Sequence, residues 1–248
     1  MEILVIGESC NDVYVYGNMN RLAPEAPVPV LQPTQEIQIG GMSMNVLQNL
    51  EALGVQAQII TNKNWESITK VRYIDHKTNQ MTLRVDSGDD QYGRASLSNV
   101  DWSTFQAVII SDYHKGFLTE QDIELIVSSH SNVFLDTKKT LGSWANAARF
   151  IKINNFEHQN TKHTLTPDLE ERLIITLGSN GCTHKGKNYP VQSVDVKDVC
   201  GAGDTFVAAL AYHYTQTKDI ELAIEFANRC ATQVIQKKGT SKININNL

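Results

Sequence analysis

Short apolar runs alternate with segments of helical periodicity along most of the chain, and this rhythm constrains the fold more than any other feature. The predicted strands are residues 2–7, 56–61, 106–112, 132–136, 148–153 and 172–178. The predicted helices are residues 43–53, 120–130 and two segments near the carboxyl end. Because buried strands that alternate with helices form parallel βαβ units, the sequence predicts an α/β fold with a doubly wound, mainly parallel sheet.

Two stretches depart from this rhythm and alternate apolar and polar residues at period two. They cover approximately residues 12–39 and 69–87. This pattern is typical of exposed antiparallel strands with one covered face. We therefore expect one domain, residues 1–248, in which these stretches form a small antiparallel β lid over the carboxyl edge of the main sheet. Such lids leave strand edges unpaired, so a homodimer is expected to form through the lid.

Composition and charge exclude several classes of partner. The net charge is −5, with acidic and basic residues interspersed, so no basic tract is present to follow a nucleic-acid backbone. No apolar run approaches the length of a membrane span, and the first residues lack the pattern of a signal peptide. The 4 scattered cysteines form no paired motif and favour neither zinc nor disulfides. We expect a cytoplasmic protein that binds neither nucleic acid nor a membrane.

The segment CGAGDTF, residues 200–206, places small residues and one acid where a strongly apolar helix begins. The backbone N–H groups of such a turn are unobstructed, and the helix dipole favours negative charge there, so Gly201, Ala202 and Gly203 predict an anion hole for phosphate. A carboxylate repels phosphate unless it takes a proton from the attacking hydroxyl, which makes Asp204 the candidate base. The alternative is that Gly203 and Asp204 only cap the helix.

A second glycine pair, Gly40 and Gly41, precedes another predicted helix. These glycines let the backbone approach a ligand, and Asn45 offers both a donor and an acceptor to a sugar hydroxyl. Asp12 follows the first strand, at the edge where sheets of this class bind ligands. All four residues are therefore predicted to bind the substrate. The alternative is an ordinary helix start with Ser43 as its cap.

Two further turns are expected at the same edge of the sheet. Asn154 and Glu157 follow one predicted strand, and the turn from Thr176 through Gly178 to Gly181 follows the next. A carboxylate can hold Mg²⁺ through water, so Glu157 is the candidate metal ligand. Asn154 and the second turn are the candidate nucleotide pocket. Taken singly, both segments are also compatible with ordinary loops.

Three motifs occur in the order and spacing of a known family: GGMSMN, NNFE and DVCGAGDTF. On these motifs the chain resembles the ribokinase-like (PfkB) carbohydrate kinases over nearly its whole length. The resemblance implies a kinase that uses ATP and Mg²⁺ to phosphorylate a sugar, with the anion hole and catalytic aspartate at residues 201–204. Cys200 stands where threonine or serine is usual in the family. This difference should not affect the anion hole, because the donors of the hole are main-chain N–H groups.

Within this family, the segments NMNRLAPEAPVPVLQ, TKVRYIDHKTNQMTLRVD, SDYHKGFLT and LDTKK look most like the D-glycero-β-D-manno-heptose-7-phosphate kinase branch. That branch is the kinase half of bifunctional ADP-heptose synthesis proteins. The resemblance implies transfer of the ATP γ-phosphoryl group to the anomeric hydroxyl of a sugar that already carries one phosphate. Local cations are then needed for that phosphate. The candidates are Arg21, Arg72, Arg84, Lys115 and Lys138. The alternative is that most of these side chains are solvated or paired with other residues at the surface.

The chain departs from the family pattern by being short in two places. Only residues 62–68 separate the strand near Thr61 from the lid strand near Thr69, where relatives carry another helix and strand, and residues 157–173 are short of a helix. We expect a reduced kinase that keeps all three motifs. We expect no adenylyl-transferring half after Leu248, and we expect another chain to supply that step.

Two rival hypotheses stay open at this point. The first keeps the kinase but changes the acceptor to another sugar, sugar phosphate or nucleoside. The second is a sugar-phosphate-binding regulator that kept the fold and lost turnover. The retained Asp204 argues against the regulator, because a protein that only binds phosphate gains nothing from a carboxylate beside it.

Overall fold

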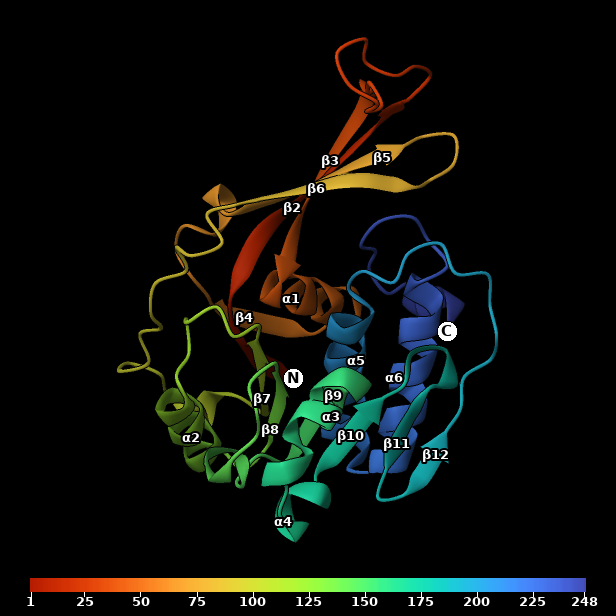
Figure 1. The fold of residues 1–248 in the computed structure, drawn as a ribbon. Coiled ribbons are helices and arrows are strands. Elements are labelled where there is room, and N and C mark those ends of the chain that lie inside the picture. Colours follow the sequence, from red (N-terminus) through yellow and green to blue (C-terminus); the bar gives the residue numbers. More distant parts are fainter.

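A computed structural model describes all 248 residues and contains two separate sheets (Figure 1). The larger sheet has the strand order β12-β11-β10-β9-β8-β7-β1-β4. Its parallel strands are β1 (Glu2–Gly7), β4 (Gln56–Ile60), β7 (Ala107–Asp112), β8 (Val133–Thr137), β9 (Phe150–Asn154) and β10 (Leu173–Thr176). The predicted doubly wound sheet is confirmed. An antiparallel hairpin, β11 (Cys182–His184) and β12 (Lys187–Tyr189), extends one edge beyond what the sequence predicted.

Helices cover both faces of this sheet. The helices are α1 (Ser43–Ala52), α2 (Glu120–Ser129), α3 (Asn155–Thr161), α4 (Pro167–Glu170), α5 (Ala202–Thr217) and α6 (Ile220–Val234). Ile3 and Val5 pack with α1, α5 and α6, whereas Leu4 and Ile6 pack with α2. This division follows because successive residues of a strand point to opposite faces. None of the helices combines the length and the apolar character needed to cross a bilayer.

The smaller sheet projects away from the main sheet, at the top of Figure 1. It contains β2 (Ser9–Asn18), β3 (Gln32–Met42), β5 (Thr69–Asp75) and β6 (Met81–Ser87), in the order β3-β2-β5-β6. The β2–β3 and β5–β6 pairs are antiparallel, as expected, but the central β2–β5 pair is parallel. The reason is that β2 and β5 continue outward from β1 and β4, which are themselves parallel neighbours.

The carboxyl ends of the parallel strands share one edge of the main sheet, and the smaller sheet rises from that edge. β2 begins only two residues after β1 ends, and β3 leads directly into α1. Between β4 and β5 the chain forms only a short 3₁₀ turn, Trp65–Ser67, so this connection is as short as the sequence indicated. The loops after β7 and β10 therefore reach the start of α5.

Candidate active site

Asp204 lies in the first turn of α5 and is only 5% exposed. Its Oδ1 accepts a hydrogen bond from the Tyr113 hydroxyl at 2.6 Å, and its Oδ2 accepts one from Asn45 Nδ2 at 3.0 Å. The residue in the capping position is Gly201, and no side chain caps the helix. The alternative in which Asp204 serves as a helix cap is therefore wrong.

Burial raises the pKa of the Asp204 carboxyl to about 6. The hydrogen bonds from Tyr113 and Asn45 lower this pKa in part, the nearby Asp136 raises it, and Lys152 lowers it. At neutral pH the carboxylate is ionised, yet its proton affinity is far higher than that of an exposed aspartate. A general base is most effective when its pKa lies near the working pH, so the environment suits Asp204 to proton transfer.

The turn before α5 leaves main-chain donors free beside this carboxylate. Ala202 N–H donates to Val199, but the N–H groups of Gly203 and Asp204 have no partner in the chain. Gly201 has a φ of 76°, and a Cβ at this position would lie 2.5 Å from Asn45 Nδ2. Only glycine therefore permits both the left-handed turn and the close approach of Asn45. Free N–H groups at a helix start can bind an anion, and the anion hole itself stays a prediction.

Lys152 adds a fixed cation to this hole. It is buried on β9, and its Nζ donates to Asp136 Oδ2 at 2.8 Å. The same Nζ lies 2.9 Å from where a Cβ on Gly203 would be. Burial opposes the charge, but Asp136, Glu157 and Asp204 raise the pKa of Lys152, so it stays protonated. Sequence reasoning missed this residue, although a lysine inside the apolar run FIKI was a signal.

Tyr113 was also missed by the sequence predictions, and it is held by a buried glutamate. Glu8 is fully buried, and its carboxylate accepts from the backbone N–H groups of Tyr113 and Lys115, each at 2.9 Å. Burial first, and the nearby Asp204 next, raise the pKa of Tyr113 well above its usual value, so the hydroxyl stays protonated and donates. The sequence positions of Glu8 and Tyr113 could have indicated their role, because each residue directly follows a buried parallel strand, where sheets of this class bind ligands.

The predicted substrate residues gather at the base of the smaller sheet. Asp12 Oδ1 accepts from Arg72 Nη1 at 2.5 Å, and a Cβ on Gly41 would lie 2.3 Å from Asp12 Oδ2. Gly40 and Gly41 belong to the end of β3, and α1 begins at Ser43, as predicted. The Ser43 hydroxyl donates to the Gly7 carbonyl at 3.0 Å and caps nothing, which excludes the simple helix-start alternative.

Asn45 has a different set of partners from the predicted one. Its Nδ2 donates to Asp204, and its Oδ1 accepts from Asn49 Nδ2 at 3.1 Å. Both ends of the amide are therefore engaged within the protein. The structure places Asn45 as a residue that positions the Asp204 carboxylate, and a contact of Asn45 with sugar stays a prediction.

The candidate phosphate-binding cations separate into two groups. Arg72 pairs with Asp12, and Lys138 Nζ lies 4.8 Å from the centre of the Tyr113 ring, so both belong to the site. Arg84 is half-exposed on β6 and pairs with Asp86 of its own strand. The side chains of the other two do not contact the Asp204 surroundings: the Lys115 ammonium pairs with Asp89, and Arg21 is exposed in the loop between β2 and β3.

A cavity of about 350 Å³ adjoins the anion hole. Thr176, Gly178 and Gly181 line it, together with Gly203 of the hole itself. The apolar part of its wall comes from Val191, Val194, Val196, Val199, Ala202, Phe206, Ala231 and Ile235, and the polar part includes Ser179, Gln192, Ser193, Asn228 and Thr232. A mainly apolar cavity with a few polar groups is typical of a small-ligand site. Asn154 does not line this cavity, because it is the N-cap of α3 and accepts from Glu157 N–H at 2.9 Å.

Glu157, the predicted metal ligand, is already engaged on both oxygens. Oε2 accepts from the Asn154 N–H at 2.7 Å, and Oε1 accepts from Lys138 Nζ at 3.1 Å. Nowhere in the chain do three or more His, Cys, Asp or Glu side chains converge to hold a metal. The residues therefore fit only a Mg²⁺ that keeps most of its ligands as water and phosphate, with Glu157 as one carboxylate in reach.

Comparison with known proteins decides the family. The sequence model of the pfkB family carbohydrate kinases matches residues 120–247, just over half of the chain. The chain belongs to the PfkB family of carbohydrate kinases. The matched region contains the turn that holds Asp204, the buried Lys152 and the walls of the adjoining cavity.

Two curated relatives cover nearly all of the chain. Bifunctional protein HldE of Sulfurimonas denitrificans is 29% identical over 300 aligned positions, which include 99% of this chain and 63% of that protein. Bifunctional protein HldE of Helicobacter pylori strain J99 is 31% identical over 296 positions, which include 97% of this chain and 64% of that protein. The chain thus spans less than two thirds of these relatives. Both alignments exceed its 248 residues, which agrees with the shortened segments of this PfkB member.

Solved structures support the same fold. A nucleoside kinase of Methanocaldococcus jannaschii, described as an archaeal member of the ribokinase family, superposes with a TM-score of 0.69 at 16% identity, over 97% of this chain and 95% of that one. An Arabidopsis thaliana ribokinase complexed with ribose and ATP gives a TM-score of 0.68 at 15% identity, over 96% of this chain and 93% of that one. The PfkB chain therefore has the ribokinase-like fold.

Proposed function

We propose that this PfkB chain is an ATP-dependent kinase that phosphorylates the anomeric hydroxyl of D-glycero-β-D-manno-heptose 7-phosphate to give the 1,7-bisphosphate. The observation that carries the reaction class is the buried Asp204 carboxylate, held beside unpaired N–H groups without capping the helix. The choice of heptose rests on the four sequence segments that resemble that branch and on the HldE relatives.

The Asp204 carboxylate removes the proton of the sugar hydroxyl as that oxygen attacks the γ-phosphorus, while the bond from this phosphorus to the bridging oxygen breaks and ADP leaves. Tyr113 and Asn45 hold the two carboxylate oxygens, so the base is oriented before the substrate arrives. The N–H groups of Gly203 and Asp204, with the Lys152 ammonium, stabilise the charge that spreads over the transferring phosphoryl oxygens. Mg²⁺, bound with the nucleotide and reached by Glu157 through water, would neutralise the phosphate oxygens.

The two substrates meet from opposite sides of Asp204. The cavity lined by Thr176, Gly178 and Gly181 receives the nucleotide, because its apolar wall suits a base and its polar end opens at the anion hole. Asp12 and Arg72 receive the sugar at the foot of the smaller sheet. We take residues 1–248 as one kinase domain in which the smaller sheet acts as a lid that excludes water.

The smaller sheet also offers a surface for a second copy of the chain. Met81, Leu83 and Val85 lie on one face of β6, and all three are exposed. β6 is an edge strand with one side unpaired. A homodimer through this sheet would bury the three apolar side chains and cover the unpaired edge of β6. Light scattering on wild type and on Leu83→Asp tests it: a dimer that the substitution converts to a monomer is expected, and a monomeric wild type overturns the dimer.

The function is tested by an ADP-release assay over phosphorylated and unphosphorylated sugars and nucleosides, with Asp204→Asn as the matched control. Turnover with heptose 7-phosphate is expected to exceed turnover with the other acceptors and to fall by about 10²–10⁴-fold in the control. Higher turnover with another sugar, sugar phosphate or nucleoside would support the kinase activity and would replace heptose 7-phosphate as the proposed substrate. Sugar-phosphate binding without ADP release from any acceptor would instead identify a regulator.

A further inference from the structure

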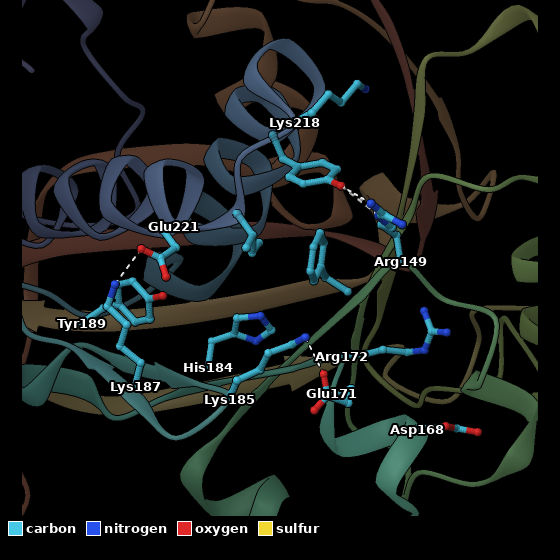
Figure 2. Close-up of a pocket in the computed structure, with 13 residues that line it drawn as sticks. Arg149, Asp168, Glu171, Arg172, His184, Lys185, Lys187, Tyr189, Lys218 and Glu221 are labelled. Atoms are coloured by element: carbon cyan, nitrogen blue, oxygen red, sulfur yellow. Dashed lines mark hydrogen bonds and ion pairs between the residues drawn. The ribbon is translucent and has the colours of Figure 1, made fainter.

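A second cavity, of about 670 Å³, lies at the opposite edge of the main sheet (Figure 2). Its walls come from the residues that begin β9 and β10, from the β11–β12 hairpin, and from the junction of α5 and α6. Asp204 stands in the first turn of α5, whereas Tyr214 in the last turn lines this cavity. Ten residues of helix separate them, or about 15 Å, so a ligand here does not reach the reacting atoms.

Positive charge predominates in this second cavity. Its lining contains the basic residues Arg149, Arg172, Lys185, Lys187 and Lys218 and the acidic residues Asp168, Glu171 and Glu221. Ion pairs join Lys185 to Glu171 and Lys187 to Glu221. No carboxylate pairs with Arg149, Arg172 or Lys218, so the cavity keeps a surplus of positive charge in a chain whose net charge is −5.

The two arginines have donors that the protein does not use. Arg149 Nε donates to the Tyr214 hydroxyl at 2.9 Å, and its Nη2 donates to the same oxygen, which leaves Nη1 free. Arg172 Nη1 donates to the Ala148 carbonyl at 2.7 Å, but its buried Nε has no partner. A buried donor without an acceptor costs free energy, and a guanidinium binds phosphate oxygens in two-point contacts. These groups suit an anion.

His184 provides a polar atom of the opposite kind. The residue is 4% exposed, its Nδ1 lies 2.7 Å from the Leu173 carbonyl, and its Nε2 is buried without a partner. Burial lowers the pKa of His184, so the ring is neutral at pH 7, and its Nδ1 must carry the proton that the carbonyl accepts. Nε2 is therefore an acceptor without a partner in the chain, and a hydroxyl or amine of a ligand can donate to it.

We propose that this cavity is a second binding site that takes a phosphate monoester bearing free hydroxyl groups, with the phosphate at Arg149 and Arg172 and a hydroxyl donating to His184 Nε2. Sugar phosphates and nucleoside monophosphates share this chemistry. Eight of the 13 lining residues are charged, which favours the sugar phosphate over a nucleotide, although Phe150, Tyr189 and Tyr214 also line the cavity. This site does not depend on which substrate the active site phosphorylates.

Calorimetric titration with glucose 6-phosphate, AMP and inorganic phosphate tests the site on wild type and on Arg149→Gln. Arg149 is exposed, so its replacement removes no packed apolar group, although the Tyr214 hydroxyl loses its donor. We expect wild type to bind a phosphate ester in an event that Arg149→Gln weakens by about 10- to 100-fold, the usual effect of losing a charge-assisted hydrogen bond. Arg94→Gln is the matched control, because Arg94 is also exposed and pairs with Asp122 on α2, and it should bind as wild type does.

Kinase turnover separates this site from the active site. Arg149→Gln is expected to keep the wild-type kcat, since Arg149 does not contact the Asp204 surroundings. Tighter binding of glucose 6-phosphate than of AMP identifies a sugar-phosphate site, and the reverse identifies a nucleotide site. Unchanged ester binding by Arg149→Gln overturns the proposal. Inorganic phosphate binding as tightly as both esters also overturns it, because the contact with His184 would then contribute nothing.

Discussion

Replacing Asp204 with asparagine separates its charge from its shape. The wild-type carboxyl has its pKa raised from 3.8 to about 6 by burial. A group whose pKa is raised by folding stabilises the native state most when protonated, so this contribution is complete below pH 3.8 and is lost as the pH rises through 6. The loss amounts to about 3 kcal/mol at neutral pH. Asparagine carries no charge, so the variant does not lose this stability as the pH rises.

The amide also introduces a cost. Its oxygen can accept from Tyr113, but its NH₂ group then faces the NH₂ group of Asn45, whose own oxygen is held by Asn49. One unsatisfied buried donor costs about 1–3 kcal/mol. Asp204→Asn should therefore fold as stably as wild type or more stably at neutral pH. Because the donor cost does not titrate, the advantage of the variant should grow by about 1.3 kcal/mol between pH 5 and pH 7.

Turnover should change in the opposite direction. Loss of the proton acceptor should lower kcat by about 10²–10⁴-fold, while ATP affinity stays the same or increases, because a negative charge near the phosphates has been removed. Denaturant unfolding of both proteins at several pH values, with kcat and ATP affinity from the same preparations, measures all three effects. Near-normal turnover, or a stability difference that does not vary with pH, would refute the role assigned to Asp204.

Three further substitutions test the surroundings of this residue. Tyr113→Phe removes a hydrogen bond that lowers the pKa of Asp204, so the acidic limb of the kcat/KM profile should move to higher pH; an unmoved limb contradicts the contact. Asp12→Ala leaves Arg72 buried without its anion, so the KM for sugar should rise and the melting temperature should fall, with ATP affinity retained; an unchanged sugar KM would misplace the sugar pocket. Ala231→Phe fills part of the cavity beside the anion hole, so the KM for ATP should rise about tenfold while the KM for sugar is constant, and equal effects on both would exclude a nucleotide there.

The main elements and the turn that leads into α5 were predictable because both depend on neighbouring residues. Each parallel strand is a short apolar run, and the glycines and the acid of residues 201–204 lie within one turn of the chain. The hairpin of β11 and β12 was not predicted, since strands of three residues carry too little periodicity. Likewise, the parallel pairing of β2 with β5 follows from the adjacency of β1 and β4, which no local pattern contains.

The partners of the functional side chains were decided by the tertiary structure alone. Asn45, Tyr113 and Asp204 come from three distant parts of the chain, and packing of α1, the loop after β7 and α5 brings them into contact. Arg84 and Lys115 were reasonable phosphate ligands by residue type, but in the fold each forms an ion pair with a nearby aspartate. Residue type determines what a side chain can bind, whereas the distance and burial that select its partner, and that raise the pKa of Asp204, arise only when remote elements pack together.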